Sequence, residues 1–161
     1  MKTIIFFITV ILNALSTGFF FAWSVSVILG TKKLGYLTYL ETMQNINREI
    51  LNPAFFIVFF GSLIALVFTT YLQFNNKTVF VLVLASTIIY LIGTFGVTAF
   101  GNVPLNDELE VLNITKLNQI ELKDFRIYYE SAWNQYHSIR TISSMVSFTL
   151  LLISIFIKKT F

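Results

Sequence analysis

Four long apolar stretches constrain the fold of this chain more than any other feature. They cover about residues 3–29, 54–72, 78–100 and 139–157. Each is close to the roughly 20 residues that an α-helix needs to cross a hydrocarbon layer about 30 Å thick. Backbone polar groups in lipid must be hydrogen-bonded internally, and these stretches lack the alternation of barrel strands. The sequence therefore predicts an all-α transmembrane four-helix bundle, with residues 1–161 forming a single integral membrane domain.

The composition supports this prediction and excludes several other classes of protein. Hydrophobic residues make up 56% of the chain and charged residues 12%, against roughly 45–50% and about 25% in soluble domains. The absence of cysteine excludes disulfide scaffolds and thiolate sites. A single histidine leaves few metal ligands, so we predict neither a metal nor another cofactor. The net charge of +3 is not gathered on a helix face, and we expect no nucleic-acid partner.

The first apolar stretch has a second interpretation as a signal peptide. Lys2 precedes the apolar run Ile4–Leu12, and Ala14-Leu15-Ser16 imitates a cleavage site. Apolar sequence nevertheless continues to Leu29, which a cleaved signal does not need and a spanning helix does. The spanning helix is the favoured interpretation.

The charges near the span ends predict the orientation in the membrane. With four spans, the N-terminus, the link 73–77 and the C-terminus lie on one side. That side carries no acidic residue and has lysines at positions 2, 77, 158 and 159, whereas segments 30–52 and 101–138 contain all eight acidic residues. Lysine and arginine near span ends favour the cytoplasm. We therefore expect both termini in the cytoplasm and the protein in the cell inner membrane, in contact with the lipid bilayer.

The two segments on the opposite side are more than linkers. Residues 30–52 and 124–138 mix aromatic and polar residues at roughly helical spacing. Aromatic side chains on such helices anchor at the level of the lipid headgroups. We expect short interfacial helices in both non-cytoplasmic loops.

The first of these loops ends in a dense polar cluster. Gln44, Arg48 and Asn52 are spaced i, i+4 and i+8, which places them on one face of a helix. Asn52 followed by Pro53 is typical of a helix N-cap and first position, although a continuous helix kinked at Pro53 is an alternative. Arg48 then lies about one turn above the hydrocarbon, where it needs a polar partner or snorkels to the headgroups.

Two further polar segments emerge on the same side. After the third span, Asn102-Val103-Pro104-Leu105-Asn106 contains a proline that is expected to interrupt the helix. At the start of the fourth span, Trp133, His137 and Arg140 are spaced i, i+4 and i+7 and share a face.

Three separated polar segments therefore converge at one membrane face. Trp23 and Ser24 of the first span lie near the same level. An amphipathic mouth that opens into an apolar bundle is typical of a site for a lipophilic ring compound with a polar head. We predict such a site here.

These segments together resemble the anthrone-oxygenase-like family, a large group of four-span membrane proteins mostly of unknown function. The resemblance follows the chain in order through residues 18–27, 43–47, 102–106 and 133–141, together with Asn52-Pro53, and Asn-Val-Pro-Leu-Asn is its most specific part. The chain departs from the family pattern at His137, where the family usually has asparagine.

The resemblance implies oxidation of an anthrone to an anthraquinone by molecular oxygen without metal or flavin. Such chemistry needs a base, groups that stabilise an oxyanion and a dry pocket. The implied catalytic residues are His137 as the base and Arg48 and Arg140 as a cationic clamp. The candidate substrate-binding residues are Gln44, Asn47, Asn52, Asn102, Asn106, Trp133, Trp23 and Ser24.

Two other classes of function remain open at this point. The chain could be a non-catalytic accessory protein, or one that binds a small molecule or a lipid. A transporter or channel is disfavoured, because the span interiors lack ionisable residues. Gly93 and Gly96 favour close helix packing, which would also suit a homo-oligomer.

Overall fold

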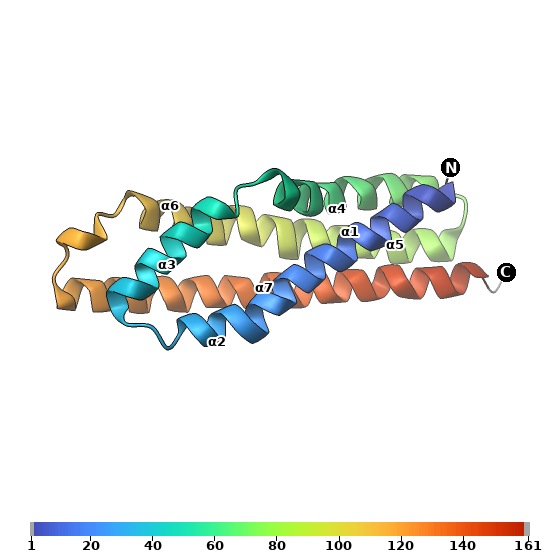
Figure 1. Ribbon diagram of the computed structural model, residues 1–161. Helices are drawn as coiled ribbons and strands as arrows, with labels where there is room; N and C mark the ends of the chain where they lie inside the picture. Colours follow the sequence, from blue (N-terminus) through green and yellow to red (C-terminus); the bar gives the residue numbers. More distant parts are fainter. Residues whose placement is uncertain (1, 160–161) are drawn as a thin grey trace.

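The structure is a computed structural model that describes residues 2–159, and every element in it is helical (Figure 1). In chain order the elements are α1 (Lys2–Ala22), a π-helix (Trp23–Val27), α2 (Ile28–Thr31), α3 (Tyr36–Glu49), α4 (Pro53–Leu72), α5 (Lys77–Ile89), two π-helices (Tyr90–Gly96 and Thr98–Asn102), α6 (Val103–Val111), a 3₁₀ turn (Ile114–Lys116) and α7 (Gln119–Lys159).

Four helices are long and apolar enough to cross a membrane: Lys2–Thr31, Pro53–Leu72, Lys77–Val111 and Gln119–Ile157. This confirms the predicted all-α, four-span fold, and the chain is a multi-pass membrane protein in contact with lipid. The last two helices extend well beyond the predicted spans. Segment 124–138, expected as a separate interfacial helix, is instead the first part of the continuous 41-residue helix α7.

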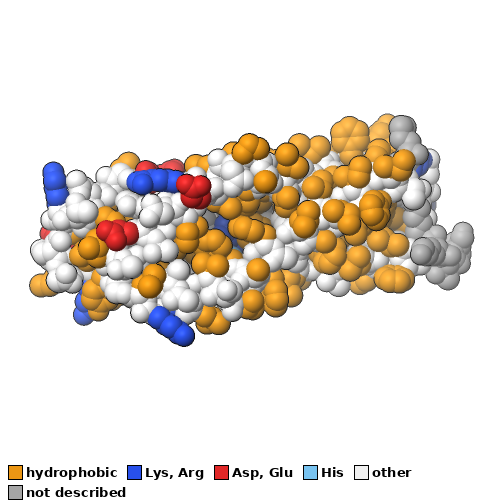
Figure 2. Space-filling view, in the orientation of Figure 1, with side chains coloured by type: hydrophobic (Ala, Val, Ile, Leu, Met, Phe, Trp, Pro, Cys, Tyr) orange, Lys and Arg blue, Asp and Glu red, His pale blue; other side chains and the backbone are white. Residues whose placement is uncertain are grey.

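The ends of the spans lie as four crossings require. The start of α1, the link between α4 and α5 and the last turns of α7 share one end of the molecule, and α3 and α6 lie at the other (Figure 1). Hydrophobic side chains cover most of the visible length, whereas most of the visible charged side chains gather at the α3 and α6 end (Figure 2). Which end faces the cytoplasm stays a prediction, as does the oligomeric state.

The start of α4 agrees with its predicted cap. The Asn52 side-chain Oδ1 accepts a hydrogen bond from the Phe55 backbone N–H at 3.0 Å, and Pro53 is the first helical residue. Asn52 itself has extended backbone angles, so α3 and α4 are separate helices rather than one kinked helix.

Pro104 does not end its helix, contrary to the expectation from the sequence. The third span runs through it to Val111. The π-helix Thr98–Asn102 precedes it, and Pro104 falls in the first turn of α6. The wider turns of a π-helix shift the backbone register, so the proline occupies a position where its missing N–H is tolerated.

Small and hydroxyl-bearing residues hold the bundle together. Hydroxyl pairs join different helices at 2.7–2.9 Å: Thr9 with Thr69, Ser16 with Tyr90, Thr70 with Thr87 and Ser86 with Ser147. A Cβ atom on Gly93 would lie 2.2 Å from the Ser143 hydroxyl oxygen, so glycine is needed there for α7 to approach. Close packing and interhelical hydrogen bonds are the forces available where lipid surrounds the helices.

A second core holds the charged end together. Tyr39, Leu40 and Met43 of α3 pack against Leu109 of α6 and Tyr129 of α7. This group of buried residues is called the cap cluster below.

A buried arginine completes this packing. The Arg126 guanidinium donates to the carbonyl oxygens of Leu34 and Lys32 and to the Glu130 carboxylate, and it lies 4.5 Å from the centre of the Tyr39 ring. Burial raises the pKa of Tyr39 above its ordinary value, so this phenol stays neutral. The contacts fix α3 across α6 and α7.

Candidate functional site

A cavity of about 270 Å³ lies where the first, third and fourth spans meet the end of α3. Seven of the residues singled out in the sequence line it: Trp23, Asn47, Arg48, Asn102, Asn106, Trp133 and Arg140. Three polar segments that are far apart in the chain therefore surround one space.

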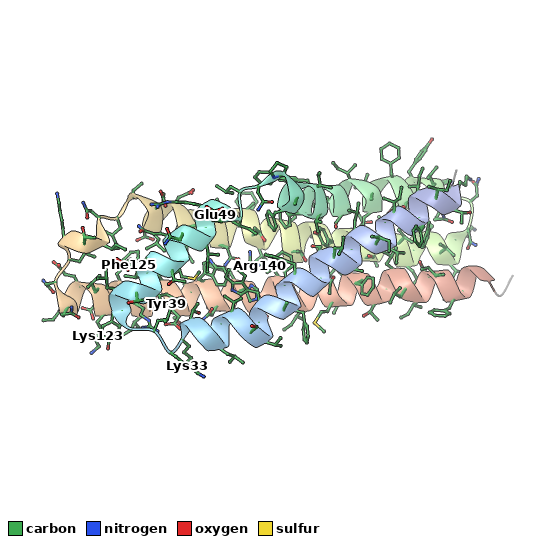
Figure 3. The ribbon with its side chains drawn as sticks, viewed as in Figure 1. Lys33, Tyr39, Glu49, Lys123, Phe125 and Arg140 are labelled. Atoms are coloured by element: carbon green, nitrogen blue, oxygen red, sulfur yellow. The ribbon has the colours of Figure 1, made fainter. Side chains whose placement is uncertain are left out.

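Arg140 is the most unusual group in the cavity wall. Only 7% of the residue is exposed, and its guanidinium carbon lies 4.9 Å from the ring centres of both Phe20 and Trp133. Figure 3 places Arg140 inside the molecule, between the charged end and the apolar length. Within residues 2–157, whose side chains the structure describes, the ion pairs are Arg48–Glu110 and Arg126–Glu130, and neither includes Arg140. Among the described residues, therefore, no carboxylate lies within ion-pair distance of this buried guanidinium.

His137 holds the Arg140 guanidinium by hydrogen bonds. Its Nδ1 accepts hydrogen bonds from Nε and Nη2 of Arg140 at 3.2 and 3.0 Å. A guanidinium only donates, so Nδ1 carries no proton and the neutral ring has its hydrogen on Nε2. The Ser24 hydroxyl, 2.9 Å from Nε2, donates to the Phe20 carbonyl and is free to accept this hydrogen. His137 is fully buried and does not line the cavity.

Local backbone geometry places the partners of His137. Trp23 and Ser24 begin the π-helix Trp23–Val27 in the first span. The ring of His137 is stacked on Trp133, with centroids 5.1 Å apart and planes 10° apart. Departures from regular α-helix of this kind are frequent at functional sites.

Three amide side chains also line the cavity: Asn47, Asn102 and Asn106. The Asn102 Nδ2 donates to the Trp133 carbonyl at 3.1 Å, whereas its buried Oδ1 has no hydrogen-bond partner in the described chain. Asn106 Oδ1 accepts from Trp133 Nε1 at 2.9 Å and from the Tyr129 hydroxyl at 3.1 Å. Asn47 donates to the same hydroxyl at 3.2 Å. Asn106 and Asn47 are thus held by the protein, whereas Asn102 has a buried acceptor without a partner in the described chain.

The three residues of the predicted polar face, Gln44, Arg48 and Asn52, each make a different contact. Arg48 pairs with Glu110 at 2.9 Å on the cavity rim, and both side chains are about half exposed. The Gln44 side chain donates to the carbonyl oxygen of Leu109 at 2.8 Å and joins α3 to α6. Asn52 caps α4. Arg48 alone of the three lines this cavity.

Several lining residues were not predicted from the sequence: Phe19, Phe20, Phe55, Thr98, Asp107 and Glu110. One signal could have found some of them. Thr98, Asn102, Asn106 and Glu110 repeat every four residues, which indicates a polar helix face that continues past Pro104. The expected interruption at Pro104 hid this pattern.

Comparison with known proteins gives one match. Residues 51–150 match the sequence profile of the family described as anthrone oxygenase. No curated protein and no solved structure matches the chain significantly. The matched region covers more than half of the chain, from before α4 into α7, and includes Asn102, Trp133 and Arg140. The chain belongs to the anthrone oxygenase family.

Proposed function

We propose that this protein is a cofactor-independent membrane oxygenase that acts on a lipophilic anthrone-, phenol- or quinol-like substrate in the cavity around Arg140. The observation that carries this proposal is the buried guanidinium without a carboxylate partner, set between two aromatic rings. Membership of the anthrone oxygenase family supports it.

The reaction balances without another oxidant or reductant. An anthrone loses a proton from the carbon opposite its carbonyl and becomes an enolate. The enolate transfers one electron to O₂, and the two radicals join in a carbon–oxygen bond. The peroxide then takes up a proton and loses water as the second carbonyl forms. One anthrone and one O₂ give one anthraquinone and one water.

Arg140 is assigned to the enolate oxygen. Charge that develops on an oxygen is stabilised most by fixed donors in a site with little water. Because His137 holds the guanidinium and Phe20 and Trp133 flank it, the donors need little reorganisation when the enolate forms.

The proton acceptor is assigned to Asp107. This carboxylate lines the cavity and takes part in neither ion pair of the described residues, whereas Glu110 is engaged by Arg48. A role for His137 as the base is less well supported, because its unprotonated nitrogen already accepts two hydrogen bonds from Arg140.

Oxygen uptake tests the proposal directly. Purified protein in lipid nanodiscs is mixed with an anthrone, and O₂ consumption and anthraquinone absorbance are recorded. We expect Arg140→Gln to reduce the rate about 100- to 1,000-fold, as loss of an oxyanion donor does. The matched control is Arg48→Gln, which removes an exposed arginine with its own carboxylate and should change the rate far less. If the Arg140→Gln variant folds and oxidises the anthrone at the wild-type rate, the proposal is contradicted.

The same arginine also supports a second candidate function. A non-catalytic protein that binds an anionic amphiphile would use the same uncompensated charge. Anthrone binding that requires Arg140, without any O₂ consumption, would favour this alternative.

A further inference from the structure

A second hollow adjoins the cavity on the side of the bundle. Its volume is about 320 Å³, and it lies between α1 and the first turns of α4. Its wall is mostly apolar, with Leu15, Ala54 and Val58 among its residues. Phe19 and Phe55 line both spaces, so the two hollows are contiguous. We call this second hollow the α1–α4 groove.

The α1–α4 groove lies at the depth of the lipid chains. α4 has 20 residues and is therefore about 30 Å long, the thickness of the hydrocarbon layer. The groove is lined by Ala54, Phe55, Val58 and Phe59, which lie in the first turns of that helix. Leu15 on the opposite wall is 53% exposed, and its surroundings outside the protein are lipid.

The other approaches to the cavity are less suited to a lipophilic compound. Toward the loops, the cap cluster of α3, α6 and α7 closes the molecule, and Trp133 belongs both to its packing and to the cavity wall. The rim that reaches water carries the Arg48–Glu110 ion pair. The route through the groove meets lipid at one end and Arg140 at the other.

Four residues line both the groove and the cavity: Phe19, Phe20, Ile50 and Phe55. Phe20 is buried, whereas Phe19 is 37% exposed and its ring lies 5.6 Å from that of Phe55. Rotation of an exposed side chain such as Phe19 needs no movement of the backbone and is fast.

We propose that the substrate enters sideways from the bilayer, between α1 and α4, and keeps its apolar body in the α1–α4 groove while its oxygen reaches Arg140. This inference rests on the proposed function for the position of the reacting oxygen. The occupant is a flat aromatic amphiphile with one anionic oxygen, because the groove is apolar and the charge at its inner end is positive and uncompensated. A phospholipid acyl chain fills the groove when the substrate is absent.

The chain carries its own reporters for this route. Its two tryptophans, Trp23 and Trp133, both line the cavity. The protein is reconstituted in vesicles of phospholipid brominated on the acyl chains, where bromine quenches nearby tryptophan fluorescence. Val58→Phe fills the groove. Ile57→Phe is the matched control, because Ile57 immediately precedes Val58 in α4, is 65% exposed and lines neither hollow.

We expect brominated lipid to quench wild type and Ile57→Phe alike, and an added anthrone to relieve that quenching by displacing the acyl chain. Val58→Phe should lose most of the quenching and should bind anthrone several-fold more slowly. If Val58→Phe does not fold, Ala54→Phe fills the same groove and takes its place.

The results separate the route from the reaction. Equal quenching of Val58→Phe and Ile57→Phe, together with anthrone binding at equal rates, overturns entry through the groove even if O₂ uptake proceeds. The expected quenching and binding pattern without O₂ uptake supports the route and removes the oxygenase function. If the anthrone does not bind the wild-type protein, both the entry route and the oxygenase function are overturned.

Discussion

Replacing His137 by asparagine and by leucine separates its support of Arg140 from its contribution to packing. Both changes remove the ring stacked on Trp133, a contact worth about 0.5–1.5 kcal/mol. Asparagine keeps an acceptor oxygen on Cγ, where the ring has Nδ1. Leucine has none, and leaves the hydrogen bonds from Arg140 at 3.2 and 3.0 Å unmade. A hydrogen bond to a charged group is worth about 1.5–3 kcal/mol.

Leucine should therefore lower the free energy of unfolding by about 1.5–3 kcal/mol more than asparagine does. For a chain of this size that corresponds to a difference in Tm of roughly 3–12 °C. Thermal unfolding in detergent, followed by tryptophan fluorescence, measures it. Affinity for an anthrone provides the second readout, because asparagine should retain binding that leucine loses. Equal Tm values and equal affinities for the two variants would show that His137 does not hold Arg140 in place.

Two further predictions concern packing and surface charge. Gly93→Ala places a methyl group 2.2 Å from the Ser143 hydroxyl and should cost about 1–3 kcal/mol of stability; Gly18→Ala, with open space around it, should be neutral or stabilising, and urea or thermal unfolding compares the two. Glu110→Gln breaks the half-exposed pair with Arg48 and should change stability by under about 1 kcal/mol, less at high salt; a larger loss in the same assay would mean that the pair is more than a surface contact.

The sequence predicts the topology well because the topology follows from the apolar stretches, which can be read directly from the sequence. Lipid demands about twenty apolar residues for each crossing, and four such runs leave little freedom in the fold. Because successive spans cross in opposite directions, the first and third loops lie on the same side, and Arg48, Asn102 and Arg140 come to the same end of the molecule. Their arrangement around one cavity follows from that constraint more than from any local motif.

The remaining features depend on contacts that periodicity does not encode. Pro104 predicts a break, and the π-helix before it, which shifts the register, has no simple sequence signal. The spacing of His137 and Arg140 indicates a shared face, but it does not show that the ring nitrogen on the other side of His137 lies against Ser24 of another span. Asp107 resembles a solvated acidic turn until α6 is seen to continue the third span.

The uncompensated Arg140 has a practical consequence for handling the protein. An empty cavity leaves a buried cation without a counterion, so any anionic amphiphile present during extraction gains free energy by occupying it. Bile-salt and fatty-acid contaminants, or an anionic detergent, will raise the apparent melting temperature and compete with added substrate. Neutral maltosides and uncharged lipids are the medium in which the vacant protein can be compared with the occupied one.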